Sequence, residues 1–290
     1  MQLNLESKYN KKNSIGKARA YLRQAAESLG IDFVEIVSED FDAIDFPKLG
    51  VGDMLYRVST DRISSAVEQH LINEKVATLY DNSYKSGRIS RASYLMFKEG
   101  NVPMPKTIAV PSLNKKIIEK YVKYLEGFPI IIKVVGSARG VGVIKVDSMS
   151  SLYSITDYLD TIGSKYIFRQ FIDVNNSERL VVLGEKVIAS IQYKASGYDF
   201  RSNSRLSATD VLEKKYSSKV QRDAIFATKL MGLEFGGVDV LIDKAGKHYI
   251  LEVNFPFGFP EAQKITGVDI AKEMMTYLQN KAIKLMKEND

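Results

Sequence analysis

The chain has 290 residues, a net charge of +6, 45% hydrophobic and 26% charged residues, two histidines and no cysteine. This length predicts two domains or one large one, with ample apolar residues for a packed core. The composition excludes disulfides and thiolate metal sites and disfavours zinc, but leaves open a hard cation held by oxygen ligands. Because no apolar run is long enough to span a membrane and the N-terminus lacks a signal-peptide core, we expect a cytoplasmic protein.

The positive net charge favours an anionic partner. Lysine and arginine are spread along the whole chain rather than clustered with aromatic residues. This distribution disfavours nucleic acid and favours a small molecule that carries phosphate.

The first 85 or so residues have the pattern of a small α/β unit. Apolar residues at helical spacing run to Gly30, and two β-branched runs and a second helical pattern follow. The predicted elements are a helix over 14–29, strands over 31–37 and 53–58, and a helix over 64–72. A polar, glycine-bearing link, NSYKSGRIS, ends this unit.

The rest of the chain mixes helices and strands. We expect helices over 91–99 and 113–125, with the proline-bearing VPMPKTIAVP extended between them. Strands over 130–135 and 141–146 and a helix over 150–159 come next, followed by strands in YIFRQFI, ERLVVLG and KVIASIQY. A helix within 208–231, strands in VDVLID and HYILEVN and a helix over 268–286 complete the order. Such mixed runs predict α+β lobes rather than one parallel sheet.

Two acidic residues near the C-terminal end interrupt apolar strands in GGVDVLID and HYILEVN. A connecting loop of two residues (245–246) or four (244–247) would place Asp239 directly opposite Glu252. Asn254 shares their face, because side chains of a strand alternate between its two faces. The other face then carries an apolar set for the core, namely Val238, Val240, Ile242, Tyr249, Leu251 and Val253.

Directly opposed carboxylates repel one another unless a cation or a proton lies between them. Asp239, Glu252 and Asn254 therefore form an oxygen-rich patch suited to Mg²⁺, which takes one or two carboxylates and completes its shell with water and substrate phosphates. A solvated sheet face is one alternative. A three-residue loop with a bulge is another, because it would shift the register by one residue and separate the acids.

A glycine-rich loop joins the two predicted strands of FPIIIKVVGSARGVGVIKV. Glycines let backbone N–H groups approach phosphate oxygens closely, and a loop between two strands is neither a P-loop nor a Rossmann turn. We expect a β-hairpin that folds over a triphosphate as a mobile flap, with Lys133 near the α- or β-phosphate. A flexible hairpin tip with an edge-strand lysine and a solvated Arg139 is the alternative.

Two further stretches are less specific. In DFRSN, Arg201 can clamp a phosphate or carboxylate and Asn203 can supply a metal oxygen, although a plain surface loop is the alternative. The stretch FRQFIDVNNSER has strand residues suited to an adenine pocket. Beyond them, Glu178 can accept hydrogen bonds from ribose hydroxyls.

Taken in chain order, PIIIKVVGSARGVGVIKV, FRQFI, DFRSN, GGVDVLI and LEVNFPFGF resemble the ATP-grasp superfamily. GYDFRSN, and EVN followed by TGVDIA, are most similar to its RimK-like glutamate ligase branch. The resemblance covers roughly residues 88 to 285. It implies an α+β fold in which two lobes hold ATP after a small α/β N-terminal domain, with domains at 1–87, 88–165 and 166–290.

The resemblance also implies a role for each matching position. Lys133 and Arg201 would be catalytic, with Lys133 as the nucleotide-binding strand lysine and Arg201 and Asn203 near the γ-phosphate and the metal. The other nucleotide contacts would be the flap residues Gly136, Ser137, Arg139, Gly140 and Gly142, the hinge residues Gln170, Phe171 and Ile172, and Glu178 at the ribose. The metal ligands for Mg²⁺ or Mn²⁺ would be Asp239, Glu252 and Asn254.

Three positions depart from the family pattern. The family usually has a lysine where this chain has Ile89, so Arg88 beside it or Lys85 upstream is expected to make the first phosphate contact. The hinge reads RQFI where relatives often read QEYI. After Asn254, the sequence 255–257 (FPF) is bulkier than the small residues common there, which can alter the acceptor pocket.

The implied reaction is an ATP-dependent carboxylate–amine ligation, in which an acyl phosphate forms and an amine then attacks it to give an amide. Closing the flap would exclude water from that intermediate. We expect an amino acid such as glutamate to be added to an amino acid, peptide or protein. We expect no membrane or nucleic-acid partner, and the sequence does not decide whether the protein forms a homo-oligomer. The rivals are a nucleotide-binding module that has lost catalysis and acts through partner contacts, and a basic scaffold for nucleic acid with strongly salt-dependent binding.

Overall fold

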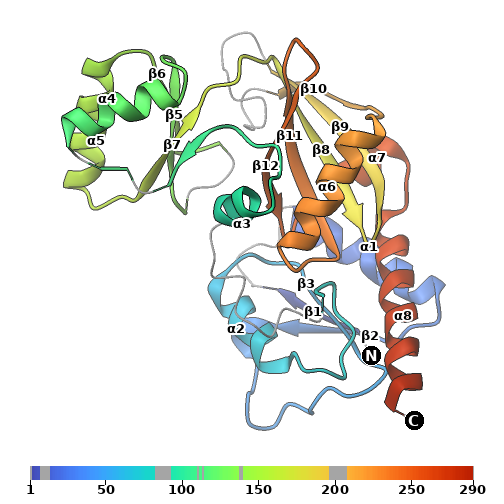
Figure 1. Cartoon of the computed structure of the whole chain (residues 1–290). Helices are drawn as coiled ribbons and strands as arrows, with labels where there is room; N and C mark the ends of the chain where they lie inside the picture. The colour runs from blue at the N-terminus through green and yellow to red at the C-terminus, as the bar shows by residue number, and fades with distance from the viewer. Residues whose placement is uncertain are drawn as a thin grey trace.

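The computed structural model describes residues 2–6, 14–81, 93–109, 111–112, 114–136, 140–195 and 208–289. Three sheets organise these residues, with strand orders β2-β1-β3, β4-β7-β5-β6 and β10-β9-β8-β11-β12. In Figure 1 the four-stranded sheet stands to one side of the five-stranded sheet, and the three-stranded sheet lies below both. The predicted α+β class is confirmed. No helix in the described ranges is long and apolar enough to cross a membrane.

The N-terminal unit is a parallel three-stranded sheet with helices around it. Its central strand β1 pairs with β2 on one side and β3 on the other. The helix over 14–29, both strands and the second helix were predicted within a few residues, whereas β1 was not. Asp61 caps the second helix by accepting a hydrogen bond from the Ser64 N–H, so that helix begins before 64. The elements are β1 (Gln2–Glu6), α1 (Ser14–Ser28), β2 (Phe33–Val37), the 3₁₀ turn η2 (Ser38–Asp40), β3 (Met54–Arg57) and α2 (Arg62–Leu71).

The middle unit is an antiparallel sheet with β5 paired to β6 and β7. Ile130, Ile132 and Phe168 are fully buried against α4 and α5, which leaves the opposite face of the sheet for a site. The elements are α3 (Ser93–Glu99), β4 (Thr107–Ile108), α4 (Lys115–Tyr124), β5 (Ile130–Val134), β6 (Val143–Val146), α5 (Met149–Thr161) and β7 (Tyr166–Gln170). Because β7 belongs to this sheet, a boundary at 165 would divide it, and we propose that the boundary follows Gln170.

The C-terminal unit is an antiparallel sheet covered on both faces. One face packs on α6, with Leu180, Val238 and Ile250 in that core. The other face packs on α1, α7 and α8, with Val181, Ile191 and Phe235 in that core. Neither β10 nor α7 was predicted. The elements are β8 (Asn176–Leu183), β9 (Lys186–Ala195), β10 (Ala208–Glu213), α6 (Ser218–Leu230), β11 (Phe235–Ile242), β12 (His248–Asn254), α7 (Pro260–Thr266) and α8 (Ile270–Asn289).

The N-terminal and C-terminal units are joined by a shared core and by backbone hydrogen bonds. The Glu234 N–H donates to the Leu79 carbonyl over 2.9 Å, and the Asp81 N–H donates to the Gly232 carbonyl over 3.0 Å. Lys281 on α8 donates to the Tyr80 carbonyl over 2.6 Å and also pairs with Glu234. The segment that leaves the N-terminal sheet is therefore held against the five-stranded sheet.

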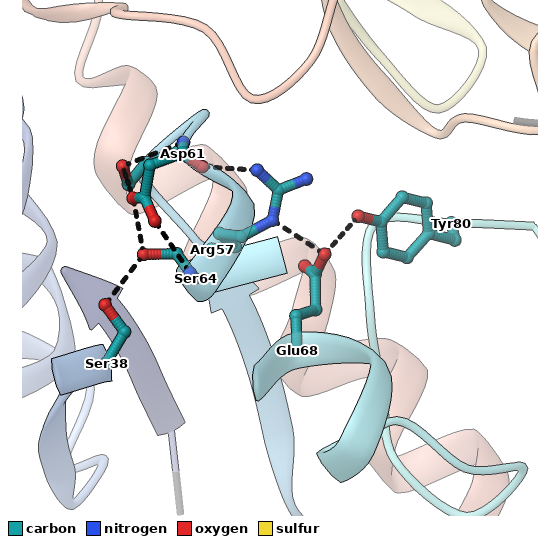
Figure 2. A network of polar contacts seen from close by, with 7 residues as sticks. Ser38, Arg57, Asp61, Ser64, Glu68 and Tyr80 are labelled. Carbon is teal, nitrogen blue, oxygen red and sulfur yellow. Dashed lines mark hydrogen bonds and ion pairs between the residues drawn. The ribbon is translucent and has the colours of Figure 1, made fainter. Parts of the chain in front are cut away.

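A network of buried polar side chains links β3, α2 and Tyr80 in the N-terminal unit (Figure 2). Glu68 on α2 is 1% exposed, and its Oε2 accepts hydrogen bonds from Arg57 Nε over 2.8 Å and from Tyr80 Oη over 2.7 Å. Beside this pair, Asp61 accepts from the backbone N–H and the hydroxyl of Ser64. A buried ion pair stabilises a fold only where such further hydrogen bonds offset its desolvation. Here they connect β3, α2 and the segment that leads to the five-stranded sheet.

We expect Glu68→Gln to lower the free energy of unfolding by about 3 kcal/mol, because it leaves the Arg57 guanidinium buried without its counter-charge. Urea denaturation followed by circular dichroism measures the change. Tyr80→Phe removes the hydrogen bond to Glu68 without leaving a buried charge and serves as the control, with a loss of about 1 kcal/mol. Equal stability of Glu68→Gln and the parent protein would contradict this account.

Candidate active site

A pocket opens where the four-stranded and five-stranded sheets face each other. Its apolar lining comes from Ile131 and Val143 on one sheet and Leu241 and Leu251 on the other, with Phe171 and Ile172 in the connection between the sheets. Its polar lining includes Lys133, Arg169, Ser177, Asp239 and Glu252. A largely apolar pocket with a few charged groups in its lining can hold a nucleobase and its phosphates.

The predicted carboxylate pair is present, although the loop that was expected to produce it is not. Asp239 on β11 lies directly opposite Glu252 on β12. The connecting loop has three residues, 244–246, since the Asp243 N–H donates to the Lys247 carbonyl over 2.9 Å. A loop of this length places Val240 opposite Ile250. A bulge at Leu251 then adds one residue to β12, which brings Glu252 opposite Asp239. The expected loop of two or four residues was therefore wrong, and the expected opposition was right.

The bulge also changes which side chains face the pocket. Leu251 and Glu252 are consecutive, yet both line it. Ile250 enters the core on the α6 side together with Val238 and Val240. The prediction that Leu251 belongs to that core is wrong, because the extra residue of a bulge reverses the alternation that precedes it. Tyr249 pairs with the pocket residue Leu241, so its assignment to the core face is wrong as well.

Two cations neutralise the opposed carboxylates. Arg179 on β8 binds Asp239 with two hydrogen bonds, Nε to Oδ1 over 2.7 Å and Nη2 to Oδ2 over 2.9 Å. Lys133 on β5 contacts Glu252 Oε2 over 2.6 Å. Burial acts to raise the pKa of Glu252, but Lys133, together with Arg169 and Arg179, lowers that pKa below its ordinary value. Glu252 can therefore stay ionised while it faces Asp239.

The oxygen atoms of this cluster fit a hard divalent cation. Asn254 donates its amide N–H groups to Asp239 Oδ2 over 3.1 Å and to the Gly237 carbonyl over 3.2 Å, and its amide oxygen accepts no hydrogen bond from the residues that the structure describes. Glu252 Oε1 accepts no hydrogen bond from the described residues, and only Oε2 is bonded to Lys133. The set has two carboxylates and one amide, and the described part of the chain holds no group of three or more Asp, Glu, His or Cys that could bind a metal. Magnesium accepts such a mixed set.

Two arginines of this site were missed from the sequence. Arg179 lies in the apolar run ERLVV, and only the pairing of β8 with β11 brings it opposite Asp239. Arg169 precedes the hinge in RQFI and lines the pocket, where its Nε donates to Thr107 Oγ1 over 3.3 Å. Burial lowers the pKa of Arg169, and nearby Glu252 partly opposes that effect. The alternation of RQFI could have placed Arg169 on the face of Lys133, but no local signal identified Arg179.

Comparison with known proteins assigns the family. The model of the RimK-like ATP-grasp domain matches residues 90–278, well over half of the chain. The chain belongs to the RimK-like ATP-grasp family. It is an ATP-grasp ligase, a class of enzyme that forms C–N bonds.

Curated relatives and solved structures extend over most of this ligase. Several relatives carry the name probable alpha-L-glutamate ligase, among them proteins from Legionella pneumophila and Vibrio atlanticus. The one from Legionella pneumophila (strain Corby) is 28% identical over 83% of this chain and 77% of its own length. The one from Vibrio atlanticus is 27% identical over 92% of this chain and 89% of its own.

Among solved structures, the ATP-grasp ligase PsnB, in complex with a phosphomimetic variant of its minimal precursor, Mg and ADP, has a TM-score of 0.74 at 15% identity. The match covers 97% of this chain and 98% of that one. The D-alanine–D-alanine ligase from Bacillus anthracis has a TM-score of 0.70 at 16% identity over the full length of both chains. These structures share the ATP-grasp fold with this ligase.

The glycine-rich hairpin of the RimK-like ligase has the expected antiparallel strands, β5 and β6. Gly136, Gly140 and Gly142 all have φ between 74° and 83°, a conformation that residues with a Cβ rarely adopt. Five predicted contacts lie outside the described residues, namely Arg88, Ser137, Arg139, Arg201 and Asn203, as do Lys85 and Ile89.

The predicted hinge lines the pocket of the ligase with all three of its residues, 170–172. The Gln170 N–H donates to the Lys106 carbonyl over 2.9 Å, and its side chain donates to Glu126 over 2.6 Å. Phe171 lies under the ammonium group of Lys145, with 4.6 Å from Nζ to the ring centroid. Because these contacts join the hinge to β6 and to the segment before β4, they fix it relative to the sheet.

Glu178 does not face the pocket. It pairs with Val240 and Gln192, and Val240 belongs to the core on the α6 side. Its neighbour Ser177 lines the pocket instead. The prediction that Glu178 faces the nucleotide pocket is therefore wrong, because strand alternation sends consecutive side chains to opposite faces.

Glu178 is also an incompletely paired buried carboxylate. It is 3% exposed, and Oε1 accepts one hydrogen bond from Gln192 over 3.0 Å, whereas Oε2 has no partner among the described residues. Burial raises the pKa of Glu178, and the Gln192 bond and Lys214 offset only part of this effect. Ionised Glu178 therefore costs stability at neutral pH.

We expect wild-type protein to lose stability relative to Glu178→Gln as pH rises from 4.5, the ordinary pKa of the carboxyl, towards 7. In this window the unfolded chain releases the proton that the folded chain retains, so rising pH favours unfolding. Urea denaturation of both proteins at several pH values should show a relative change on the order of 1 kcal/mol. Parallel stability curves would contradict the raised pKa.

Proposed function

We propose that this RimK-like ATP-grasp ligase activates a carboxylate substrate with ATP as an acyl phosphate and joins it to an amine. We further propose that the amino acid is of the glutamate type and that the acceptor is an amino acid, a peptide or a protein. The observation that carries the proposal is that Lys133, Asp239 and Glu252 line one largely apolar pocket, with Arg179 and Asn254 hydrogen-bonded to Asp239. The relatives named probable alpha-L-glutamate ligase support the choice of amino acid.

The shape of the pocket supports ATP as the nucleotide. An adenine ring fits between Ile131 and Val143 on one side and Leu241 and Leu251 on the other. The phosphates then extend towards Lys133, whose ammonium group lies between the two lobes. Phosphate oxygens compete with Glu252 for that ammonium group, so Lys133 can serve the nucleotide once it binds.

The chain's own groups suit phosphoryl transfer to a carboxylate. Lys133 orients the phosphates, and Arg179 keeps Asp239 in place. Asp239, Glu252 and Asn254 would hold Mg²⁺, which when bound neutralises the charge on the β- and γ-phosphates. Val135, just before the glycine loop, and Val141, within it, are 60% and 68% exposed, and such apolar side chains can cover the pocket and exclude water.

We expect the protein to release ADP and phosphate only when ATP, a divalent cation, an amino acid and an amine acceptor are all present. A phosphate-release screen with pools of amino acids and peptides measures this, and mass spectrometry of the active pools should reveal a new amide. We expect glutamate-containing pools to be active. Nucleotide binding without any new amide across the pools would contradict the proposal.

We expect Glu252→Gln to lower turnover by more than about a hundredfold, because loss of even an outer-shell partner of a metal typically costs 10- to 100-fold. The fold should remain intact, since the amide of this variant would keep an oxygen for Lys133. Steady-state phosphate release measures turnover, and circular dichroism measures the fold. Full activity in Glu252→Gln would remove the proposed metal role of Glu252.

A further inference from the structure

A further carboxylate, Glu261, is separated from Arg179 by the ring of Tyr193, and no role has been assigned to it. Tyr193 on β9 pairs with the pocket residue Ser177 and shares the sheet face of Arg179. Arg179 lies over the Tyr193 ring, with 5.6 Å from Cζ to the centroid. At the far end of the ring, Tyr193 Oη donates a hydrogen bond to Glu261 Oε2 over 2.9 Å. Direct contacts therefore run from the proposed metal ligand Asp239 through Arg179 and Tyr193 to Glu261.

The loop after Asn254 brings Glu261 to this position and holds it there. Phe255 contacts the Tyr80 ring at a centroid distance of 4.9 Å, and Tyr80 is the residue that the buried network fixes (Figure 2). Phe257 packs closely on Gly237, where a Cβ would lie 2.7 Å from the ring, and Phe259 is fully buried. Helix α7 then starts at 260, against β9 (Figure 1). Three aromatic anchors, of which Phe257 and Phe259 are buried and Phe255 is half-buried, thus fix the backbone that carries Glu261.

Glu261 differs from the other carboxylates of this face in exposure and pairing. Asp239 and Glu252 each contact a cationic side chain, whereas Glu261 is exposed and has no cationic partner in the described ranges. Its hydrogen-bond donor is the neutral hydroxyl of Tyr193, whose pKa is raised by burial and, against the effect of Arg179, by Glu261. An oriented carboxylate that has no cationic partner in the described part of the chain is suited to bind a cation from solution.

We infer that Glu261, oriented by Tyr193, binds the ammonium group of the amine substrate. This inference rests on the proposed ligase function and deepens it, because it assigns the acceptor side of the site and requires a primary ammonium group on the acceptor. The alternative is that the Tyr193–Glu261 bond only docks α7 on β9. Glu261→Gln separates the two roles, since the amide oxygen still accepts the Tyr193 hydrogen bond while the negative charge is lost.

The test compares two nucleophiles in full-length protein with ATP, Mg²⁺ and L-glutamate at pH 7. Hydroxylamine is a neutral nucleophile that traps the acyl phosphate as a hydroxamate, and the dipeptide Glu-Glu carries an N-terminal ammonium group. In Glu261→Gln we expect the KM for Glu-Glu to rise about tenfold to a hundredfold, the size of a lost charge-assisted hydrogen bond. Hydroxamate formation and the melting temperature should not change.

Two further variants serve as controls. Tyr193→Phe keeps the charge of Glu261 but not its orientation, and should raise the KM for Glu-Glu by a smaller factor. Glu273→Gln removes an exposed carboxylate on α8 and should leave both reactions unchanged.

An unchanged KM for Glu-Glu in Glu261→Gln, or an equal loss of hydroxamate and dipeptide product, would overturn the inference. Absence of hydroxamate from the wild-type protein with every carboxylate tried would instead count against the proposed function. The two failures are therefore distinguishable.

Discussion

Two carboxylates that face each other across neighbouring strands set the central constraint of this molecule. Carboxylates at directly opposed positions repel each other, so this pair needs positive charge beside it. Arg179 comes from the same sheet, but Lys133 comes from the other lobe, and its 2.6 Å contact with Glu252 spans the space between the lobes. The ion pair between Lys133 and Glu252 therefore links two separately packed units at the point where an anionic substrate can enter.

An irregularity in β12 adapts this pair to its pocket. A three-residue loop alone would leave the acids out of register, and the bulge at Leu251 corrects the register one residue before Glu252. The same bulge turns Leu251 into the pocket beside Glu252. One extra residue thus provides an apolar wall and a charged group next to each other, which is the combination that a nucleotide requires.

The N-terminal unit contributes rigidity to the loop that follows Asn254. Its buried Glu68 holds the Tyr80 hydroxyl, and the Tyr80 ring contacts Phe255, the residue after Asn254. Tyr56 of the same unit also contacts Phe255, at a centroid distance of 6.0 Å. The family usually has small residues in this loop. The bulky Phe255 found here instead packs against aromatic rings of the N-terminal unit.

Local pattern was sufficient for much of this description. The apolar runs and glycines predicted most helices and strands, and alternation placed Asp239, Glu252 and Asn254 on one face and Lys133 in a strand beside the glycine loop. Arg179, Leu251 and Glu178 were decided only by the tertiary structure. Alternation determines which side chains share a face of a strand. Which face becomes core depends on whether α6 covers it. A bulge reverses the alternation beyond it, and no local residue marks the position of the bulge. The short strand β1 has no strong local signal either, because its place at the centre of a sheet comes from β2 and β3 on both sides.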